Sequence, residues 1–246
     1  MMSQKSNSIA LIDLGSQVGG GSLERRLSPF RRVGRQSLLE RTIRRLSESS
    51  LLDAIVIVGG DEHVAGMEQS STQPAIWIPS QEQSSAARAW QAAEQMNAEW
   101  IVSTSPTSVF VDPILIDRLL SAAWGNPQSD MVGFASAAKP GLCIEGAGLA
   151  GDACHRRVLE RLRRDQAFDS DNRSLSQLVV SMPEVFHNQL IPLPAVLEHT
   201  DLRFLLETEH DLDKAVMILE ATGEDTDYRD LVHLARHFAL PRKQAV

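Results

Sequence analysis

The sequence predicts a three-layer α/β fold, in which helices cover both faces of a mostly parallel, Rossmann-like sheet. Short apolar runs alternate along the chain with amphipathic segments of helical period, and a Gly-rich stretch follows the first run. Apolar runs without polar alternation are typical of strands buried on both faces, and their alternation with helices predicts right-handed βαβ units. Ligands of such sheets bind beyond the carboxyl ends of the strands.

In the first half of the chain, apolar runs predict strands at residues 9–14, 53–58, 75–78 and 100–103. Apolar residues of helical period predict helices at residues 38–46 and 85–96, and a third helix begins where Asp112 precedes Pro113. An aspartate at the N-cap and a proline at the first helical position are typical of a helix start. The Gly-rich residues 15–22 and the segment after Ser103 therefore lie at the same edge of the predicted sheet.

The second half of the chain shows weaker patterns. Strands are predicted at residues 131–135 and 185–190, an extended crossing at 140–144, and helices at 152–164 and 228–238. Thr208 and Asp211 have the spacing of a capping box, which predicts a helix that carries Leu212, Ala215, Val216 and Leu219. The polar residues 165–174 offer little apolar surface for burial and predict a mobile loop.

The composition excludes several classes of function. The chain has 246 residues, 43% of them hydrophobic, which is enough for one domain with a sizeable core. The formal net charge of -8 excludes nucleic acids and anionic membranes as expected partners, and no apolar stretch approaches the roughly 20 residues of a membrane span. Cys143 and Cys154 lack a metal-ligand pattern, so we expect neither a disulfide framework nor a zinc site, and a cytoplasmic location.

The stretch LGSQVGGGS is the first candidate binding site. Glycines allow the backbone to come close to a ligand, and successive N–H groups after a strand can bind phosphate oxygens. The spacing differs from the phosphate loop of ATPases and from the dinucleotide-binding fingerprint, and a purely structural turn is the alternative. The predicted nucleotide contacts in this stretch are Leu14, Gly15, Gly19, Gly20, Gly21 and Ser22. Eight arginines between residues 25 and 45 form either a local anion site or a solvated helix face.

Four segments, in order along the chain, carry a family resemblance: SLERRLSPFRRVGRQSLLERTIRRL, VSTSPTSVFVDPILIDRL, PGLCIE and LLETEHDLDKA. They resemble the cytidylyltransferases that activate acylneuraminates and spore-coat polysaccharide sugars, whose fold is that of the nucleotide-diphospho-sugar transferases. In that family a Gly-x-Pro-Leu element begins the first helix; here Gly34, Leu38 and Leu39 hold this part, and Ser37 replaces the proline. The resemblance covers residues 9–222 and implies transfer of a nucleotidyl group from CTP to a sugar or sugar acid, with release of pyrophosphate.

The resemblance also implies that a first-loop arginine and a lysine hold the triphosphate during catalysis. Arg26 stands at the arginine position, but the lysine position falls on Ser28, for which Arg25 or Arg31 is the nearest substitute. A planar guanidinium does not replace a compact ammonium freely. Arg88 matches a family arginine near the base or ribose.

The family holds Mg²⁺ with the aspartate of a Gly-Asp-x-Pro element and a later aspartate, so the resemblance implies Mg²⁺ as the cofactor. The first position falls on Thr107, a poor Mg²⁺ ligand, and the second on Glu207, which keeps a carboxylate. Glu145 of PGLCIE matches the family's acidic residue and is the predicted sugar contact. The structural alternatives are a solvated loop for Arg26, a turn for Glu145, and stabilisation of the following helix N-terminus for Glu207.

Three hypotheses for the function follow. The first is an active cytidylyltransferase of nucleotide-sugar or polysaccharide biosynthesis, and the second is a relative that binds a nucleotide or a protein partner without turnover. The third is a glycosyltransferase, for which Asp169-Ser170-Asp171 has the spelling of the metal motif, although no strand precedes it. Loss of one preorganised electrostatic partner costs on the order of 10² to 10³ in rate, so the substitutions at Ser28 and Thr107 predict turnover that is absent or far below that of an intact family member.

We expect one domain with a nucleotide-binding half (residues 1–125), a sugar-binding half (126–222) and a C-terminal helical extension (223–246). The sequence is compatible with a homodimer. His233 and His237 are four residues apart on the last predicted helix, which is the spacing of two metal ligands. Because no third ligand accompanies them, we expect a surface or core role for both.

Overall fold

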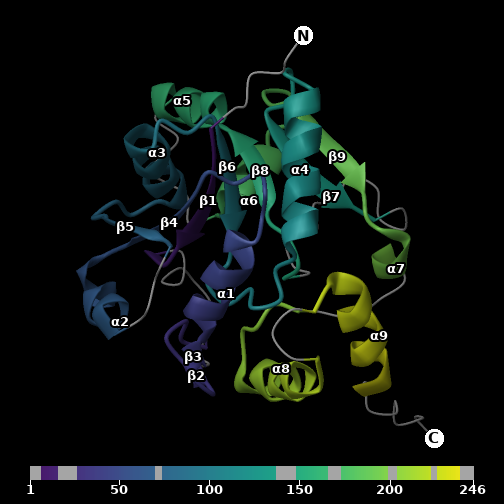
Figure 1. The fold of residues 1–246 in the computed structure, drawn as a ribbon. Coiled ribbons are helices and arrows are strands. Elements are labelled where there is room, and N and C mark those ends of the chain that lie inside the picture. The colour runs from purple at the N-terminus through teal and green to yellow at the C-terminus, as the bar shows by residue number, and fades with distance from the viewer. Residues whose placement is uncertain are drawn as a thin grey trace, which may run out of the picture.

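The computed structural model describes residues 7–15, 27–69, 74–136, 148–165, 173–198, 204–222 and 226–238, and the structural statements below refer to these residues. Seven strands form the central sheet in the order β5-β4-β1-β6-β8-β7-β9 (Figure 1). Strands β1 (Ser8–Asp13), β4 (Ala54–Gly59), β5 (Ile76–Pro79) and β6 (Trp100–Thr104) run parallel to one another. The predicted mostly parallel sheet is therefore confirmed.

Helices cover both faces of this sheet (Figure 1). One apolar cluster contains residues of α1 (Leu38–Ser47) and α4 (Pro113–Gly125), together with Ala10 and Ile12 of β1. The other contains residues of α3 (Ser85–Gln95), α5 (Arg156–Arg164) and α6 (Leu175–Val180), together with Ile9 and Leu11. Because side chains alternate along a strand, β1 is buried from both sides, and the three-layer architecture is confirmed.

The helix starts that the sequence predicts are formed by side-chain caps. Ser37 and Glu40 form a capping box on α1, in which Ser37 Oγ accepts from the Glu40 N–H at 3.1 Å and Glu40 accepts from the Ser37 N–H at 2.6 Å. A proline at this position, as in the resembling family, lacks that N–H. Ser84 caps α3 and Asp112 caps α4, with Pro113 in its first turn.

Two predicted elements of the second half were wrong in their bounds. The predicted helix at residues 152–164 contains a strand, β8 (Asp152–His155), and only then α5. The strand forms because it lies antiparallel between β6 and β7 (Met131–Ala135) and pairs with both, so distant partners override local helical pattern. The predicted strand at residues 185–190 starts later, as β9 (Asn188–Pro192), because Val185 and Phe186 are hydrogen-bonded in a turn to Met182.

Several short elements lacked a sequence prediction. They are the hairpin β2 (Arg32–Val33) and β3 (Gln36–Ser37), a 3-10 turn at Asp61–His63, α2 (Val64–Gln69), α6 and α7 (Ala195–Glu198). None exceeds six residues, which is too short for a period to stand out. The predicted crossing at residues 140–144 and residues 166–172 of the predicted mobile loop lie outside the described residues.

The last two helices, α8 (Glu209–Thr222) and α9 (Tyr228–Phe238), pack against each other, and both predicted helices are confirmed (Figure 1). The capping box before α8 is formed, since the Thr208 N–H donates to Asp211 at 2.9 Å and the Asp211 N–H donates to Thr208 Oγ1 at 3.2 Å. Leu231 and Val232 of α9 are buried in the same cluster as α1 and α4. The C-terminal helix is thus part of the main core.

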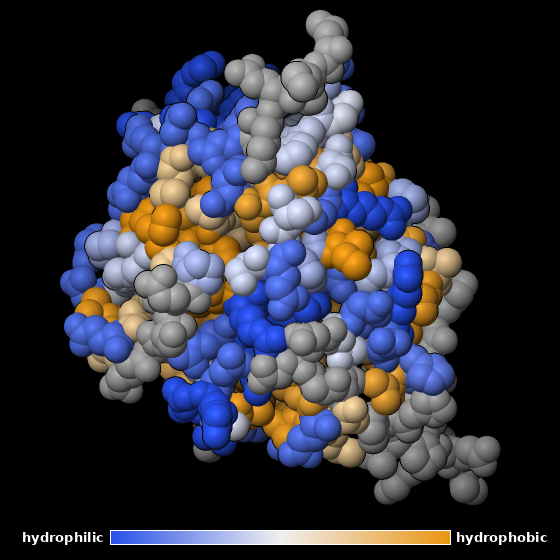
Figure 2. All heavy atoms as spheres, viewed as in Figure 1, coloured by the Kyte–Doolittle hydropathy of each residue, from blue (hydrophilic) through white to orange (hydrophobic). Residues whose placement is uncertain are grey.

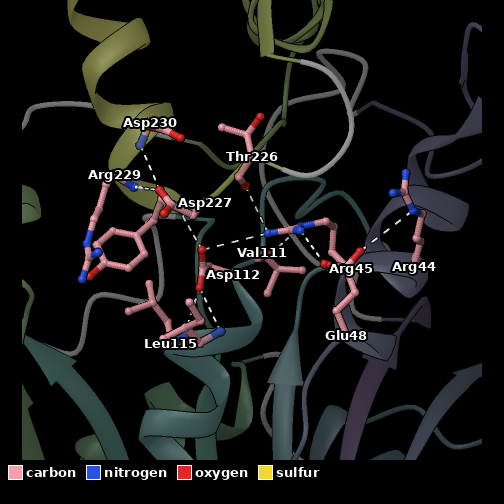
Figure 3. A network of polar contacts seen from close by, with 12 residues as sticks. Arg44, Arg45, Glu48, Val111, Asp112, Leu115, Thr226, Asp227, Arg229 and Asp230 are labelled. Carbon is pink, nitrogen blue, oxygen red and sulfur yellow. Dashed lines mark hydrogen bonds and ion pairs between the residues drawn. The ribbon is translucent and has the colours of Figure 1, made fainter.

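Asp112 connects α9 to α4 (Figure 3). One carboxylate oxygen accepts from the Ile114 and Leu115 N–H groups of α4 at 2.9 and 3.2 Å, and the other accepts from the Tyr228 N–H of α9 at 2.9 Å. Arg45 of α1 lies beside it and donates to the carbonyls of Val111 and Thr226. A single buried carboxylate therefore caps α4 and binds the first N–H of α9, which is distant in sequence.

On the face shown in Figure 2, hydrophobic residues of the described chain lie in separate groups between hydrophilic ones. The exposed large hydrophobic residues come from different parts of the fold: Ile76, Ile114, Val185 and Met217. Singly exposed apolar side chains are ordinary on a protein surface. None of the described helices combines the length and the apolar character that a bilayer crossing requires.

Candidate functional site

The carboxyl ends of the parallel strands meet at one edge of the sheet. Leu14 continues β1 beyond its last residue, because its N–H donates to the carbonyl of Val58 on β4 at 2.8 Å. Ser80 does the same for β5, with its N–H bonded to the Gly59 carbonyl at 2.9 Å. The start of the Gly-rich stretch and the loop between β5 and α3 therefore leave this edge from fixed points.

Arg88, the predicted base or ribose contact, is buried at this edge. Its Nε and Nη2 donate to the two carboxylate oxygens of Asp13, at 2.6 and 3.0 Å. Its Nη1 donates to the carbonyls of Glu82 and Gln83, at 2.8 and 2.9 Å. This planar, bidentate pairing uses the geometry in which a guanidinium and a carboxylate fit best.

Gly15 packs directly against that guanidinium. Its N–H donates to Asp13 Oδ1 at 3.0 Å, and a Cβ added to Gly15 would lie 2.6 Å from Arg88 Cζ. Among the described glycines, the positive φ values belong to Gly34 and Gly148, so Gly15 has a backbone that other residues can adopt. It is the close approach of Arg88 that requires glycine here.

Ser28 and Arg31, predicted to act on the phosphates, lie in the turn that precedes β2. Ser28 Oγ accepts from the Phe30 N–H at 3.3 Å, and Arg31 is exposed, with Nη2 3.9 Å from Glu209 of α8. The Leu27 N–H donates to the carbonyl of Glu207 at 3.0 Å. The structure thus brings the predicted phosphate segment next to Glu207, although the two are far apart in the sequence.

Thr107, the predicted first metal position, lies in the turn after β6. Its side chain is buried, and Thr107 Oγ1 is 3.2 Å from Ser105 Oγ, a hydrogen-bond distance. The turn is held from α1, because Thr42 Oγ1 donates to the carbonyl of Pro106 at 3.3 Å. The hydroxyl of Thr107 is therefore already engaged within the protein.

Comparison with known proteins identifies the family of this chain. The profile of the MobA-like NTP transferase domain matches residues 19–212, which is more than half of the sequence. The chain belongs to the MobA-like NTP transferase family. A search of the curated proteins found no match.

Solved structures share the nucleotidyltransferase fold of this MobA-like chain at low identity. A cytidylyltransferase from Leptospira borgpetersenii serovar Hardjo-bovis is 14% identical, with a TM-score of 0.77 and coverage of 98% of both chains. A CMP:2-keto-3-deoxy-manno-octonic acid synthetase complexed with CTP is 14% identical, with a TM-score of 0.61 and coverage of 89% of this chain and 99% of that one. A 4-diphosphocytidyl-2C-methyl-D-erythritol synthase from Anaerococcus prevotii is 13% identical, with a TM-score of 0.57 over 88% of this chain and 97% of that chain.

The described residues of this MobA-like domain do not fit a magnesium site. Mg²⁺ prefers carboxylate oxygens, yet the described part of the chain gathers no group of three His, Cys, Asp or Glu side chains that could hold a metal ion. At the two predicted positions stand the engaged hydroxyl of Thr107 and Glu207.

Several predicted site residues of the MobA-like domain lie outside the described residues. They are Gly19, Gly20, Gly21, Ser22, Arg26 and Glu145, together with Asp169 and Asp171 of the alternative glycosyltransferase motif. The sequence reasoning missed Asp13, which pairs with Arg88. The available signal was an acidic residue at the end of an otherwise apolar strand, where a buried charge needs a partner.

Proposed function

We propose that this protein binds a nucleoside triphosphate at the carboxyl ends of β1 and β6, and that it binds CTP more tightly than ATP, GTP or UTP. Nucleotidyl transfer to a sugar or sugar acid is slower by at least about 10²-fold than in a family member with the lysine and the metal carboxylate in place. The proposal rests chiefly on Gly15: its backbone leaves β1 at the edge where ligands of such sheets bind, and it carries no side chain between Arg88 and that edge.

The backbone can bind phosphate without the substituted side chains. N–H groups that follow a strand in a Gly-rich stretch are fixed donors for phosphate oxygens. In this chain the stretch starts from Leu14, whose backbone is held on β4. Arg26 adds the positive charge that the resemblance assigns to the phosphates, and Glu145 is the proposed sugar contact.

The chemistry needs more than binding. Pyrophosphate leaves only if the charge that develops around the α-phosphate is neutralised. Ser28 offers a hydroxyl where the resembling family has an ammonium, and Thr107 offers a hydroxyl where it has a carboxylate. Both changes act on the transferring phosphate, so they lower the rate more than the affinity.

The relatives support cytidine as the base. Two of the similar solved structures are named for cytidylyl or CMP transfer, and one of these holds CTP. The resemblance of four segments to acylneuraminate and spore-coat cytidylyltransferases supports a sugar acid as the acceptor. We extend both substrates to this chain as part of the proposal.

Calorimetry and thermal shift with the four nucleoside triphosphates, with and without Mg²⁺, test the binding. A ligand at a hundredfold its Kd stabilises the fold by about 2.7 kcal/mol, which we expect for CTP. Arg26→Ala should weaken CTP binding, whereas Arg164→Ala at the end of α5, an equal change of charge outside the proposed site, should not. Absence of binding for all four nucleotides would refute the proposal.

Pyrophosphate release with CTP and a panel of sugar acids tests the second part. We expect a rate well below about 1 s⁻¹, an ordinary enzyme rate. Turnover at about that rate or faster with any nucleotide and sugar pair contradicts slow transfer and establishes an active transferase.

A further inference from the structure

Arg88 joins two segments that are distant in the sequence. Asp13 ends β1, and Arg88 lies 75 residues later on α3. The same guanidinium donates to the carbonyls of Glu82 and Gln83, in the loop between β5 and α3. One side chain therefore fixes both the strand end before Gly15 and the loop that faces it.

The guanidinium is poorly suited to contact a phosphate. It is buried, and its three nitrogens donate to Asp13 and to the two loop carbonyls. Asp13 neutralises its charge through two oxygens, so an incoming phosphate would have to displace an existing bidentate ion pair. The same pair keeps the Asp13 carboxylate from facing a triphosphate as an uncompensated negative charge.

We propose that Arg88 is a positioning residue, which holds Gly15 and residues 80–84 in place around the nucleotide and does not contact the nucleotide itself. This inference rests on the proposed nucleotide binding. It differs from the sequence expectation, in which Arg88 meets the base or ribose directly.

Gly15→Ala perturbs Arg88 without removing a charge. The added methyl would lie 2.6 Å from Arg88 Cζ, and the guanidinium can move away only by giving up its bonds to Asp13 and the loop carbonyls. Gly125→Ala is the matched control, because Gly125 ends α4 and a Cβ there meets nothing within 4 Å. We expect CTP to bind Gly15→Ala at least about tenfold more weakly, and the control to bind as the unmodified protein does.

A charge cycle separates positioning from contact. Arg88→Met removes the guanidinium that compensates the buried charge of Asp13 and that donates to the two loop carbonyls, so nucleotide affinity should fall at least about tenfold. In the double variant Asp13→Asn with Arg88→Met the loop carbonyls still lack their donor, but both charges are gone, so affinity should return to within about threefold of the unmodified protein if Arg88 acts chiefly by compensating Asp13 at the end of β1. Equal losses in the single and the double variant would show that compensation of Asp13 plays no part, and would overturn the inference.

Hydrogen exchange without nucleotide makes the test independent of the proposed function. The Glu82 N–H donates to Ser80 Oγ at 3.2 Å, and the N–H of residue 15 donates to Asp13. Both amides should exchange about tenfold faster in Gly15→Ala than in Gly125→Ala. If no nucleotide binds the unmodified protein, the proposed function fails; this faster exchange would still support Arg88 as a positioning residue, and equal exchange would overturn it.

Discussion

Replacing Asp112 with alanine removes the N-cap of α4 and the acceptor of the first N–H of α9 at once. The carboxylate accepts three backbone N–H groups, two from α4 and one from α9, and it is 1% exposed. Loss of an N-cap costs about 0.5–2 kcal/mol, and leaving the buried Tyr228 N–H without an acceptor costs about 1–3 kcal/mol. We therefore expect Asp112→Ala to lower the free energy of unfolding by about 1.5–5 kcal/mol, a large part of the usual 5–15 kcal/mol.

Two variants calibrate this value. Asp112→Asn keeps one carbonyl oxygen, so it can still cap one of the two helices and should cost about half as much. Asp227→Ala removes an exposed cap that serves α9 alone, since Asp227 accepts from the Arg229 and Asp230 N–H groups at 2.8 and 3.0 Å. A loss of about 1 kcal/mol is expected there.

Urea unfolding followed by circular dichroism measures all three variants. Their m values should agree with that of the unmodified protein, so that a shift in midpoint reports stability alone. Hydrogen exchange of α9 amides should accelerate in Asp112→Ala more than in Asp227→Ala. If Asp112→Ala costs no more than Asp227→Ala, Asp112 does not hold α4 and α9 together.

Three further predictions concern protons and catalysis. Burial, followed by the charge of Arg157, lowers the pKa of His155, whose Nδ1 accepts the backbone N–H of Arg157 at 3.1 Å at the start of α5. The stability that the neutral imidazole provides is present above the ordinary pKa of 6.5, and it is lost as pH falls below 6.5 because the unfolded chain then binds the proton more readily. In urea titrations His155→Ser, which keeps a cap without a titrating ring, should flatten that pH dependence, and an unchanged slope would contradict it. Burial raises the pKa of Asp130, but the hydrogen bond from the His187 N–H and the interactions with Arg157 outweigh it and hold this pKa below 3.8. The stability that the ionised carboxylate provides is therefore present above pH 3.8 and is lost as pH falls through the lowered pKa. Asp130→Asn should reduce this loss of stability in acid, and an equal loss in both proteins would contradict the prediction. The double variant Ser28→Lys with Thr107→Asp should raise metal-dependent pyrophosphate release from CTP by about tenfold or more, in protein shown to be folded by circular dichroism. Ser28→Arg is the control for charge alone. No increase would mean that the residues at these two positions do not limit the rate.

The sequence predicted the elements whose pattern is local. Apolar runs located β1, β4, β5, β6 and β7 to within a residue or two, and α9 has the predicted bounds. The strand β8 was hidden because it is four residues long and forms by pairing with β6 and β7, which lie elsewhere in the chain. Helical period begins only at Val158 and Leu159, so a single helix fitted the residues as well as a strand followed by a helix.

In the candidate site, too, the sequence predicted the residues that belong to a local pattern but not the contacts between distant segments. The sequence predicted Leu14 and Gly15 at the carboxyl end of β1 because a strand followed by glycines is a local pattern. The roles of Arg88 and Asp112 depend on partners 75 and 116 residues away, Asp13 and the Tyr228 N–H. Residue spacing carries no information on such distant pairs. The sequence therefore showed a capping aspartate and an arginine on a helix, but not the contact of Asp112 with α9 or of Arg88 with Asp13.

The contacts that hold Gly15 differ from those that hold Ser28 and Thr107, two positions at which this chain departs from the resembling family. Nucleotide affinity and transfer rate can therefore depend on different parts of the proposed site. Gly15 leaves a strand end that is bonded to β4 and packed on a buried ion pair, so its position does not depend on Ser28 or Thr107. Ser28 lies in a turn joined to α8 through Leu27 and Glu207, and Thr107 lies in a turn joined to α1 through Pro106. Under the proposed function, changes at these two turns alter the groups around the transferring phosphate while the strand ends stay in place. We therefore expect this protein to keep the affinity for a nucleotide that its backbone provides under the proposed function, and to lose the rate that depends on the two side chains.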